Sequence, residues 1–261
     1  MPRPSSISRR LWSRFVPLLL LALILPSNRL HSSETLHVAV ASNFRTAFQA
    51  LADTFASRTG IRALPSYGST GKLHAQIRHG APFHIFLSAD TETPRRLHAA
   101  GLTAEAPFIY AIGKLVLWVP AGTLDNDMER AFRSGALSRI AMANPGVAPY
   151  GRAARQVLNR LDLRSPYADR MVYGENVGQV LTFVASGNAE AGFIARAQVP
   201  GGEMDKRGRI WQAPSDSHDP IAQSAVLLNN GKEHPHARRF ITFITSDDAR
   251  TRIAKLGYDV P

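Results

Sequence analysis

After the first thirty or so residues, short apolar runs alternate with segments whose apolar positions recur at helical spacing. Residues 36–40 alternate and then become fully apolar, which predicts a strand. The apolar residues of 44–55 recur at helical spacing, and Gly60 ends that predicted helix. The same order of strand and helix continues over residues 61–101. Strands that alternate with helices predict a parallel sheet.

A second series follows residues 110–120, a long apolar run that reads as a strand leaving the first sheet. Its strands are expected at residues 139–143, 171–173 and 191–195, with helices at 152–161 and 177–186, and two further helices at 236–245 and 247–256 finish the chain. Residues 221–228 are apolar and long enough to return to the first series. Two series joined by two long strands predict two lobes with a cleft between them. We place lobe 1 at residues 34–113 and 222–261, and lobe 2 at residues 114–221.

Four polar loops follow the ends of predicted strands, two in each lobe. They are Ser42-Asn43, Ser69-Thr70, Ala148-Pro149-Tyr150 and Asn176-Val177. Ligands of open α/β sheets bind beyond the carboxyl ends of the strands. Ser42-Asn43 and Ser69-Thr70 also stand where helices are about to start, and the first N–H groups of a helix are unpaired and carry a partial positive charge. These two helix starts therefore predict a cradle that holds a small oxyanion largely by hydrogen bonds.

Residues 1–33 predict an export signal that is removed from the mature protein. Arginines at positions 3, 9, 10 and 14 precede an apolar core at residues 15–25, and Pro26 breaks that core. The core is too short to span a bilayer interior of about 30 Å, so we expect no membrane insertion after cleavage. The adjacent Arg9 and Arg10 leave both the general secretory and the twin-arginine routes open.

The formal net charge of +11 falls to +6 without residues 1–33, which hold five arginines and no acid. The remaining basic residues are scattered, whereas a nucleic-acid-binding surface concentrates them on one stripe with aromatic residues between. We therefore expect no nucleic-acid partner. The chain has no cysteine, which excludes disulfides, thiolate metal sites and a lipid anchor on cysteine.

Several short segments together resemble the periplasmic molybdate-binding proteins of ABC importers over essentially the whole mature chain. They are Ala39-Val40-Ala41-Ser42-Asn43, Tyr67-Gly68-Ser69-Thr70-Gly71, Gly80-Ala81-Pro82, Phe86-Leu87-Ser88-Ala89-Asp90, Asn144-Pro145, Pro149-Tyr150-Gly151, Glu175-Asn176-Val177 and Ala191-Gly192-Phe193. The resemblance implies the α/β, two-lobed periplasmic-binding-protein fold of type II. In that fold two mostly parallel sheets, flanked by helices, are joined by two crossover strands, and the ligand cleft lies between the lobes.

The resemblance further implies a periplasmic monomer that captures molybdate or tungstate and passes it to the membrane permease and ATPase of an ABC importer. It implies no cofactor and no catalytic residue. It assigns ligand contacts through hydroxyls to Ser42 and Ser69, and through backbone N–H groups to Ala148 and Val177.

Many members of that family carry a tyrosine where this chain has Ala195, so one hydroxyl is missing here. Tyr150, in a Pro-Tyr-Gly loop that other members share, is the candidate for the lost donor. Asn43 stands where many members have leucine and could add its amide.

Other interpretations stay open at this point. Ser42 and Ser69 could be plain helix caps, and Tyr150 could be only a wall of the cleft. The bound anion could be sulfate, phosphate or chromate. An anion-using enzyme is a further alternative, but the Gly68–Lys72 segment departs from a phosphate-binding loop, with Ser66 where that loop needs glycine and Leu73 after the lysine.

No pattern predicts a metal site. His74, His79 and His84 are spaced by five residues, which does not place them on one helical face. His234 and His236 have no third ligand nearby in the sequence.

Overall fold

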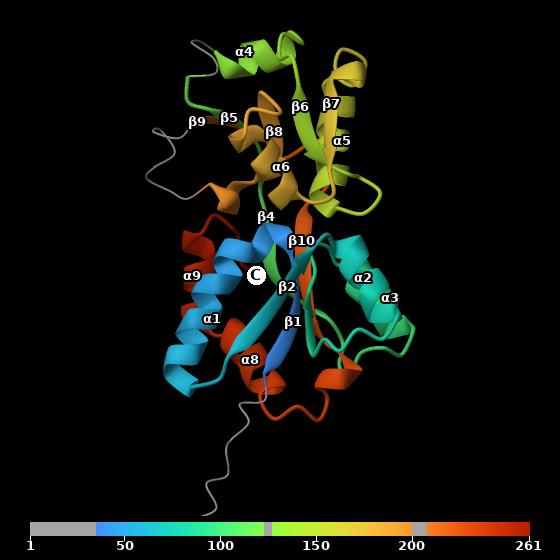
Figure 1. Ribbon diagram of the computed structural model, residues 1–261, viewed down its shortest axis with the longest axis vertical. Coiled ribbons are helices and arrows are strands. Elements are labelled where there is room, and N and C mark those ends of the chain that lie inside the picture. Colours follow the sequence, from blue (N-terminus) through green and yellow to red (C-terminus); the bar gives the residue numbers. More distant parts are fainter. Residues whose placement is uncertain (1–34, 123–126, 200–207) are drawn as a thin grey trace, which may run out of the picture. The chain divides into compact units, whose positions relative to one another are not determined.

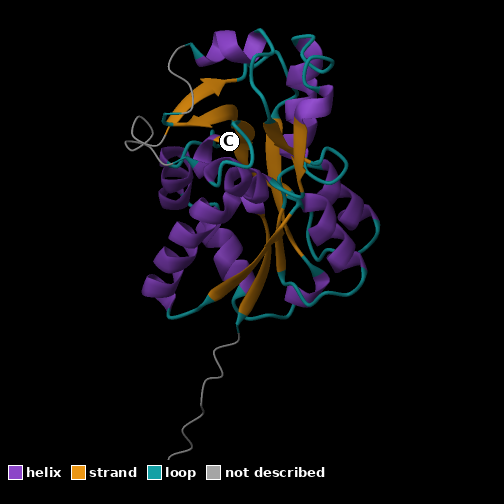
Figure 2. Ribbon diagram, turned by 45° about the horizontal axis from the view of Figure 1, so that its top comes forward, coloured by secondary structure: helices purple, strands orange, loops and turns teal. Residues whose placement is uncertain are grey.

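A computed structural model describes residues 35–122, 127–199 and 208–261, and the predicted export signal lies outside them. The described chain falls into two five-stranded sheets with helices around each (Figures 1 and 2). Among the described residues, no helix is both long and apolar enough to cross a membrane.

The first sheet has the order β2-β1-β3-β10-β4. Its strands are β1 (Leu36–Ala41), β2 (Ala63–Gly68), β3 (Ile85–Leu87), β4 (Phe108–Gly113) and β10 (Ile221–Leu227). Its helices are α1 (Arg45–Thr59), α2 (Thr70–Arg78), α3 (Glu92–Ala99), α8 (Ala237–Ile244) and α9 (Asp247–Lys255), with the short 3-10 helices η1 (Ser42–Phe44) and η4 (Asn229–Gly231).

Helices cover both faces of the first sheet, which explains why residues 38–41 of β1 are all apolar and buried. Leu36, Val38 and Val40 belong to the core that packs against α1, α8 and α9. Ala39 points to the opposite face, where it meets Leu73 of α2 and the core beneath α3. Because side chains alternate along a strand, a fully apolar run is what a sheet covered by helices on both faces requires. Figure 1 shows these helices on the two sides of the sheet.

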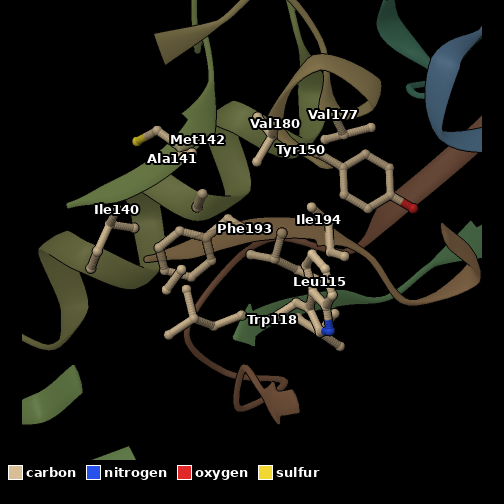
Figure 3. Close-up of a cluster of buried hydrophobic side chains, with 14 of the residues drawn as sticks. Leu115, Trp118, Ile140, Ala141, Met142, Tyr150, Val177, Val180, Phe193 and Ile194 are labelled. Atoms are coloured by element: carbon tan, nitrogen blue, oxygen red, sulfur yellow. The ribbon is translucent and has the colours of Figure 1, made fainter. Parts of the chain in front are cut away.

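The second sheet has the order β7-β6-β8-β5-β9. Its strands are β5 (Leu115–Pro120), β6 (Ile140–Ala143), β7 (Met171–Gly174), β8 (Ala191–Ala195) and β9 (Gly208–Gln212). Its helices are α4 (Met128–Arg133), α5 (Pro149–Arg160) and α6 (Val177–Ala185), with η2 (Ala168–Arg170) and η3 (Arg196–Gln198). Figure 3 shows the apolar cluster of this lobe, in which Ile140, Phe193 and Ile194 pack with Val180 of α6.

One strand in each sheet runs against the other four, β10 in the first and β5 in the second. Only Lys114 separates β4 from β5. The chain therefore leaves the first sheet at the carboxyl ends of its parallel strands and enters the second sheet at the carboxyl ends of the parallel strands there. A strand that enters from that edge must run opposite to its neighbours. The predicted two-lobed α/β fold with mostly parallel sheets is confirmed. The single long strand expected over residues 110–120 is wrong, because this segment forms two strands in different sheets.

Three histidines gather near the start of the first sheet. The backbone N–H of His37 donates to Nδ1 of His84 over 3.0 Å, and the ring of His234 lies 4.2 Å from that of His84 between centroids. Burial, and then the neighbouring His234 and His37, lower the pKa of His84 to about 4. His84 therefore stays neutral in the folded protein at pH values where a free histidine is charged.

We expect this histidine to make the folded protein sensitive to acid. The unfolded chain, with an ordinary histidine pKa of about 6.5, binds a proton before the folded chain does. The contribution of His84 to stability is therefore complete above about pH 6.5 and is lost as the pH falls towards about 4. His84→Gln keeps an acceptor for His37 but cannot be protonated. Its melting temperature should fall less between about pH 7 and about pH 5 than that of the parent protein. Equal falls would contradict this assignment.

Candidate functional site

A small cavity lies where loops of the two lobes meet. All six residues that the sequence assigns to the ligand line it. The complete lining is Ala41, Ser42, Asn43, Gly68, Ser69, Thr70, Ala89, Ala148, Pro149, Tyr150, Asn176 and Val177. The structure thus brings together four loops that are far apart in the sequence, and each of them begins a helix.

Ser42 begins η1 at the end of β1 and is 5% exposed. Its side chain caps neither η1 nor α1, and its hydroxyl makes no hydrogen bond within the described part of the chain. The interpretation of Ser42 as a plain helix cap is therefore wrong. A buried hydroxyl without a protein partner at a cavity wall is suited to donate to a ligand.

Ser69 caps α2, because its Oγ accepts a hydrogen bond from the N–H of Lys72 over 3.4 Å. This bond uses an acceptor lone pair and leaves the hydroxyl proton of Ser69 able to donate. The hydroxyl of the neighbouring Thr70 accepts from the N–H of Ala89 over 3.0 Å, which fixes the loop that follows β3. Ser69 can therefore act as a helix cap and as a ligand donor at once.

The start of α5 requires a correction. The N–H of Ala148 donates to the carbonyl of Asn144 over 2.9 Å and is therefore not free for a ligand, although Ala148 lines the cavity. Pro149, at the first position of the helix, has no N–H, and no side chain caps this helix. The first backbone N–H of α5 on the cavity lining is therefore that of Tyr150, two residues after the predicted donor.

The start of α6 leaves a donor where the sequence expects one. Oδ1 of Asn176 accepts from the N–H groups of Gly178 and Gln179, over 2.9 and 3.1 Å. The remaining N–H of this first turn belongs to Val177, which lines the cavity and is 3% exposed. Because Asn176 occupies the N–H groups of Gly178 and Gln179, the N–H of Val177 is the one that remains to donate to a ligand.

The side chain of Asn43 is committed to the protein. Its Nδ2 donates to Oε1 of Gln223 over 2.8 Å and to the hydroxyl of Tyr258 over 3.3 Å. Both amide protons have acceptors, so the amide itself is not free to bind a ligand, and only the backbone of Asn43 remains for that role.

Gln223, a residue that the sequence did not single out for the site, is the third residue of β10 and is fully buried. Its position in a mostly apolar predicted strand was a usable sign, because a buried glutamine must find hydrogen-bond partners for its amide. The hydroxyl of Tyr150 accepts a hydrogen bond from Nε2 of Gln223 over 3.3 Å. Burial, and then Tyr258 and Tyr110, raise the pKa of Tyr150 well above its ordinary value, so its hydroxyl stays protonated.

Several bonds join the two lobes around the cavity. The N–H of Gly71 donates to the carbonyl of Val147 over 2.9 Å. Two ion pairs flank it, Lys72 with Glu175 and Arg152 with Asp90, each at 2.6 Å. The lobes are therefore closed over the cavity.

All the lining residues are neutral, and the flanking cations are each paired with a carboxylate. The lining contains no carboxylate, histidine, lysine or thiol, and its polar side chains are hydroxyls and amides. No group of three or more metal-binding side chains occurs in the described residues. Hydroxyls and N–H groups at the starts of helices suit a small anion whose oxygens only accept hydrogen bonds.

Residues 36–259 match the model of a family described as bacterial extracellular solute-binding protein. The molybdate-binding protein ModA of Azotobacter vinelandii is 40% identical to the chain, over 85% of the chain and 88% of the relative. ModA of Rhodobacter capsulatus is 37% identical, over 84% of the chain and 86% of the relative. The solved structure of the Azotobacter vinelandii periplasmic molybdate-binding protein superposes with a TM-score of 0.81 at 37% identity, covering 87% of this chain and 99% of that one. The chain therefore belongs to the bacterial extracellular solute-binding proteins and, among them, to the ModA family.

Proposed function

We propose that this protein captures molybdate in the periplasm and delivers it to the permease and ATPase of an ABC importer. The observation that carries the proposal is the neutral cavity formed by four helix starts, two from each lobe. Relatives at 40% and 37% identity that are named for molybdate binding support the choice of anion. Tungstate has the same tetrahedral shape and charge, and we propose that it binds too.

Molybdate is a dianion with four oxygens that accept hydrogen bonds and donate none. In a cavity without a cation, helix dipoles and charge-assisted hydrogen bonds must replace its hydration shell. The same arrangement disfavours a protonated anion, because the proton of that anion would face a donor. Binding, release and transport require no reaction at this site, and we propose no catalytic role.

We propose direct contacts through the hydroxyls of Ser42 and Ser69 and through the backbone N–H groups of Asn43, Tyr150 and Val177. Ala148 would shape the cavity without donating, since its N–H is bound to Asn144. These contacts come from both lobes, so an anion that makes all of them holds the lobes together. We further propose a monomer with lobe 1 at residues 34–113 and 222–261 and lobe 2 at residues 114–221.

A thermal shift experiment with the mature protein tests the choice of anion. A ligand at 100 times its dissociation constant stabilises the folded state by about 2.7 kcal/mol, which raises the melting temperature by several degrees. Molybdate and tungstate should each produce this rise, whereas sulfate and phosphate at the same concentration should produce little. A rise with sulfate or phosphate that equals the rise with molybdate would contradict the proposal and favour a receptor for another oxyanion.

A further inference from the structure

The side chain of Tyr150 leaves the anion cavity and reaches the crossovers between the lobes. Figure 3 shows its ring beside the apolar cluster, with the hydroxyl pointing away from Val180 and Phe193. That hydroxyl lies directly against the backbone of Gly113, where any Cβ would overlap it. Gly113 ends β4, one residue before the chain enters the other sheet.

The same hydroxyl contacts the second crossover. Nε2 of Gln223, near the start of β10, donates to it over 3.3 Å. A single atom of α5 thus touches both segments that join the lobes. Neither Gly113 nor Gln223 lines the anion cavity, so these two contacts of the hydroxyl lie outside it.

A buried hydrogen-bond network determines the orientation of Gln223. Its Oε1 accepts from Nδ2 of Asn43 over 2.8 Å and from the hydroxyl of Tyr110 over 3.0 Å. Its amide nitrogen must therefore face Tyr150. The hydroxyl of Tyr258 completes the network by donating to the carbonyl of Asn43 over 2.8 Å. We call Asn43, Tyr110, Gln223 and Tyr258 the polar socket, and all four are at most 4% exposed.

The polar socket and the Tyr150 hydroxyl that contacts it come from different lobes. The four socket residues lie in η1, β4, β10 and the segment after α9, all of which belong with the first sheet. Tyr150 comes from α5, which packs in the second lobe. Asn43 also lines the cavity, so the socket shares one residue with the proposed anion site.

We propose that the Tyr150 hydroxyl is a latch for lobe closure, which docks into the polar socket against Gly113 and does not donate to the anion. This inference rests on the proposed function, because the anion is what draws the lobes together. Tyr150 then has two separate tasks. Its backbone N–H faces the cavity, and its hydroxyl holds the closed arrangement. Tyr150 is thus a positioning residue for binding through its side chain.

A double-mutant cycle with Tyr150→Phe and Gln223→Met tests the latch, with molybdate titrated into each variant and its association and dissociation rates measured. Loss of a neutral hydrogen bond predicts that molybdate dissociates roughly three- to tenfold faster from Tyr150→Phe, with an unchanged association rate. The melting temperature without anion should stay that of the parent, since the latch acts in the closed state. The losses from the two substitutions should overlap, so that the double variant binds about as well as the weaker single variant.

Additive losses, or unchanged binding by Tyr150→Phe, would overturn the latch and leave the proposed function intact. Failure of the parent protein to bind molybdate would overturn both. A lower melting temperature of Tyr150→Phe without anion would show a merely structural role and would also overturn the latch. If Gln223→Met fails to fold, Gly113→Ala tests the socket instead, because its methyl group blocks the socket without removing a polar group. The latch then predicts that Tyr150→Phe, which removes the overlapping hydroxyl, restores part of the binding that Gly113→Ala loses, and no recovery would overturn it.

Discussion

Gly113→Ala is expected to abolish tight anion binding while changing the stability of the protein without anion much less. The added methyl group would overlap the hydroxyl of Tyr150 and would lie 2.7 Å from Nε2 of Gln223. Overpacking of this kind costs about 1–3 kcal/mol, and the latch bond is lost in addition. Affinity for molybdate should therefore fall by about a hundredfold or more.

The stability of the protein without anion should change less. Gly113 lies in a strand and has no positive φ angle, so alanine can adopt its backbone conformation and restricts the unfolded chain, a gain of about 0.4–1 kcal/mol. The methyl group still lies 2.7 Å from Nε2 of Gln223 in the same lobe, so this side chain must shift and overpacking offsets that gain. Calorimetric titration with molybdate and thermal unfolding without it separate the two effects.

The double variant Gly113→Ala with Tyr150→Phe provides the control. Removal of the hydroxyl relieves the closest overlap but leaves the ring carbon Cζ 2.9 Å from the new methyl group. The double variant should therefore bind molybdate more tightly than Gly113→Ala alone, yet more weakly than Tyr150→Phe alone. If Gly113→Ala bound molybdate as tightly as the parent, closure of the lobes would not require the Tyr150 hydroxyl to lie against Gly113.

Ser42→Ala and Ser69→Ala should weaken molybdate binding equally but differ in their effect on the protein without anion. A hydrogen bond from a hydroxyl to a dianion contributes about 1.5–3 kcal/mol, so each variant should bind roughly ten- to a hundredfold more weakly. Ser69 also caps α2, and loss of that cap should cost about 1 kcal/mol of stability. Ser42 caps no helix, so its replacement should leave stability without anion within about 0.5 kcal/mol.

Each serine variant is the control for the other, because both remove one hydroxyl from the same cavity. Titration calorimetry with molybdate gives the loss of affinity, and urea unfolding without anion gives the loss of stability. An unchanged affinity in Ser69→Ala, together with the expected loss of stability, would reduce Ser69 to a plain cap. An unchanged affinity in Ser42→Ala would remove Ser42 from the site.

Much of the architecture follows from the sequence, because hydrophobic periodicity is a local property. The apolar run at residues 38–41 of β1 and the helical spacing of α1 were sufficient to predict both elements. The same approach did not identify α4, whose six residues are too few to establish a period. It also missed β9, an edge strand in which exposed and buried residues are mixed.

The chain also determined where the candidate site lies, since small polar residues at the ends of strands and the starts of helices are visible in the sequence. All six predicted residues line one cavity for this reason. Which of their atoms are free was decided only in three dimensions. The N–H of Ala148 is taken by Asn144, the amide of Asn43 by Gln223 and Tyr258, and the hydroxyl of Tyr150 lies against Gly113.

Sequence pattern therefore specified residues and elements, whereas tertiary structure specified donors and acceptors. The physical reason is that hydrophobic burial is roughly proportional to area and has no direction, so it leaves a periodic trace along the chain. A hydrogen bond depends on a distance of about 3 Å and on direction between groups that the sequence separates widely. Gln223 and Tyr150 stand 73 positions apart, and only the return of β10 beside β4 brings them into contact.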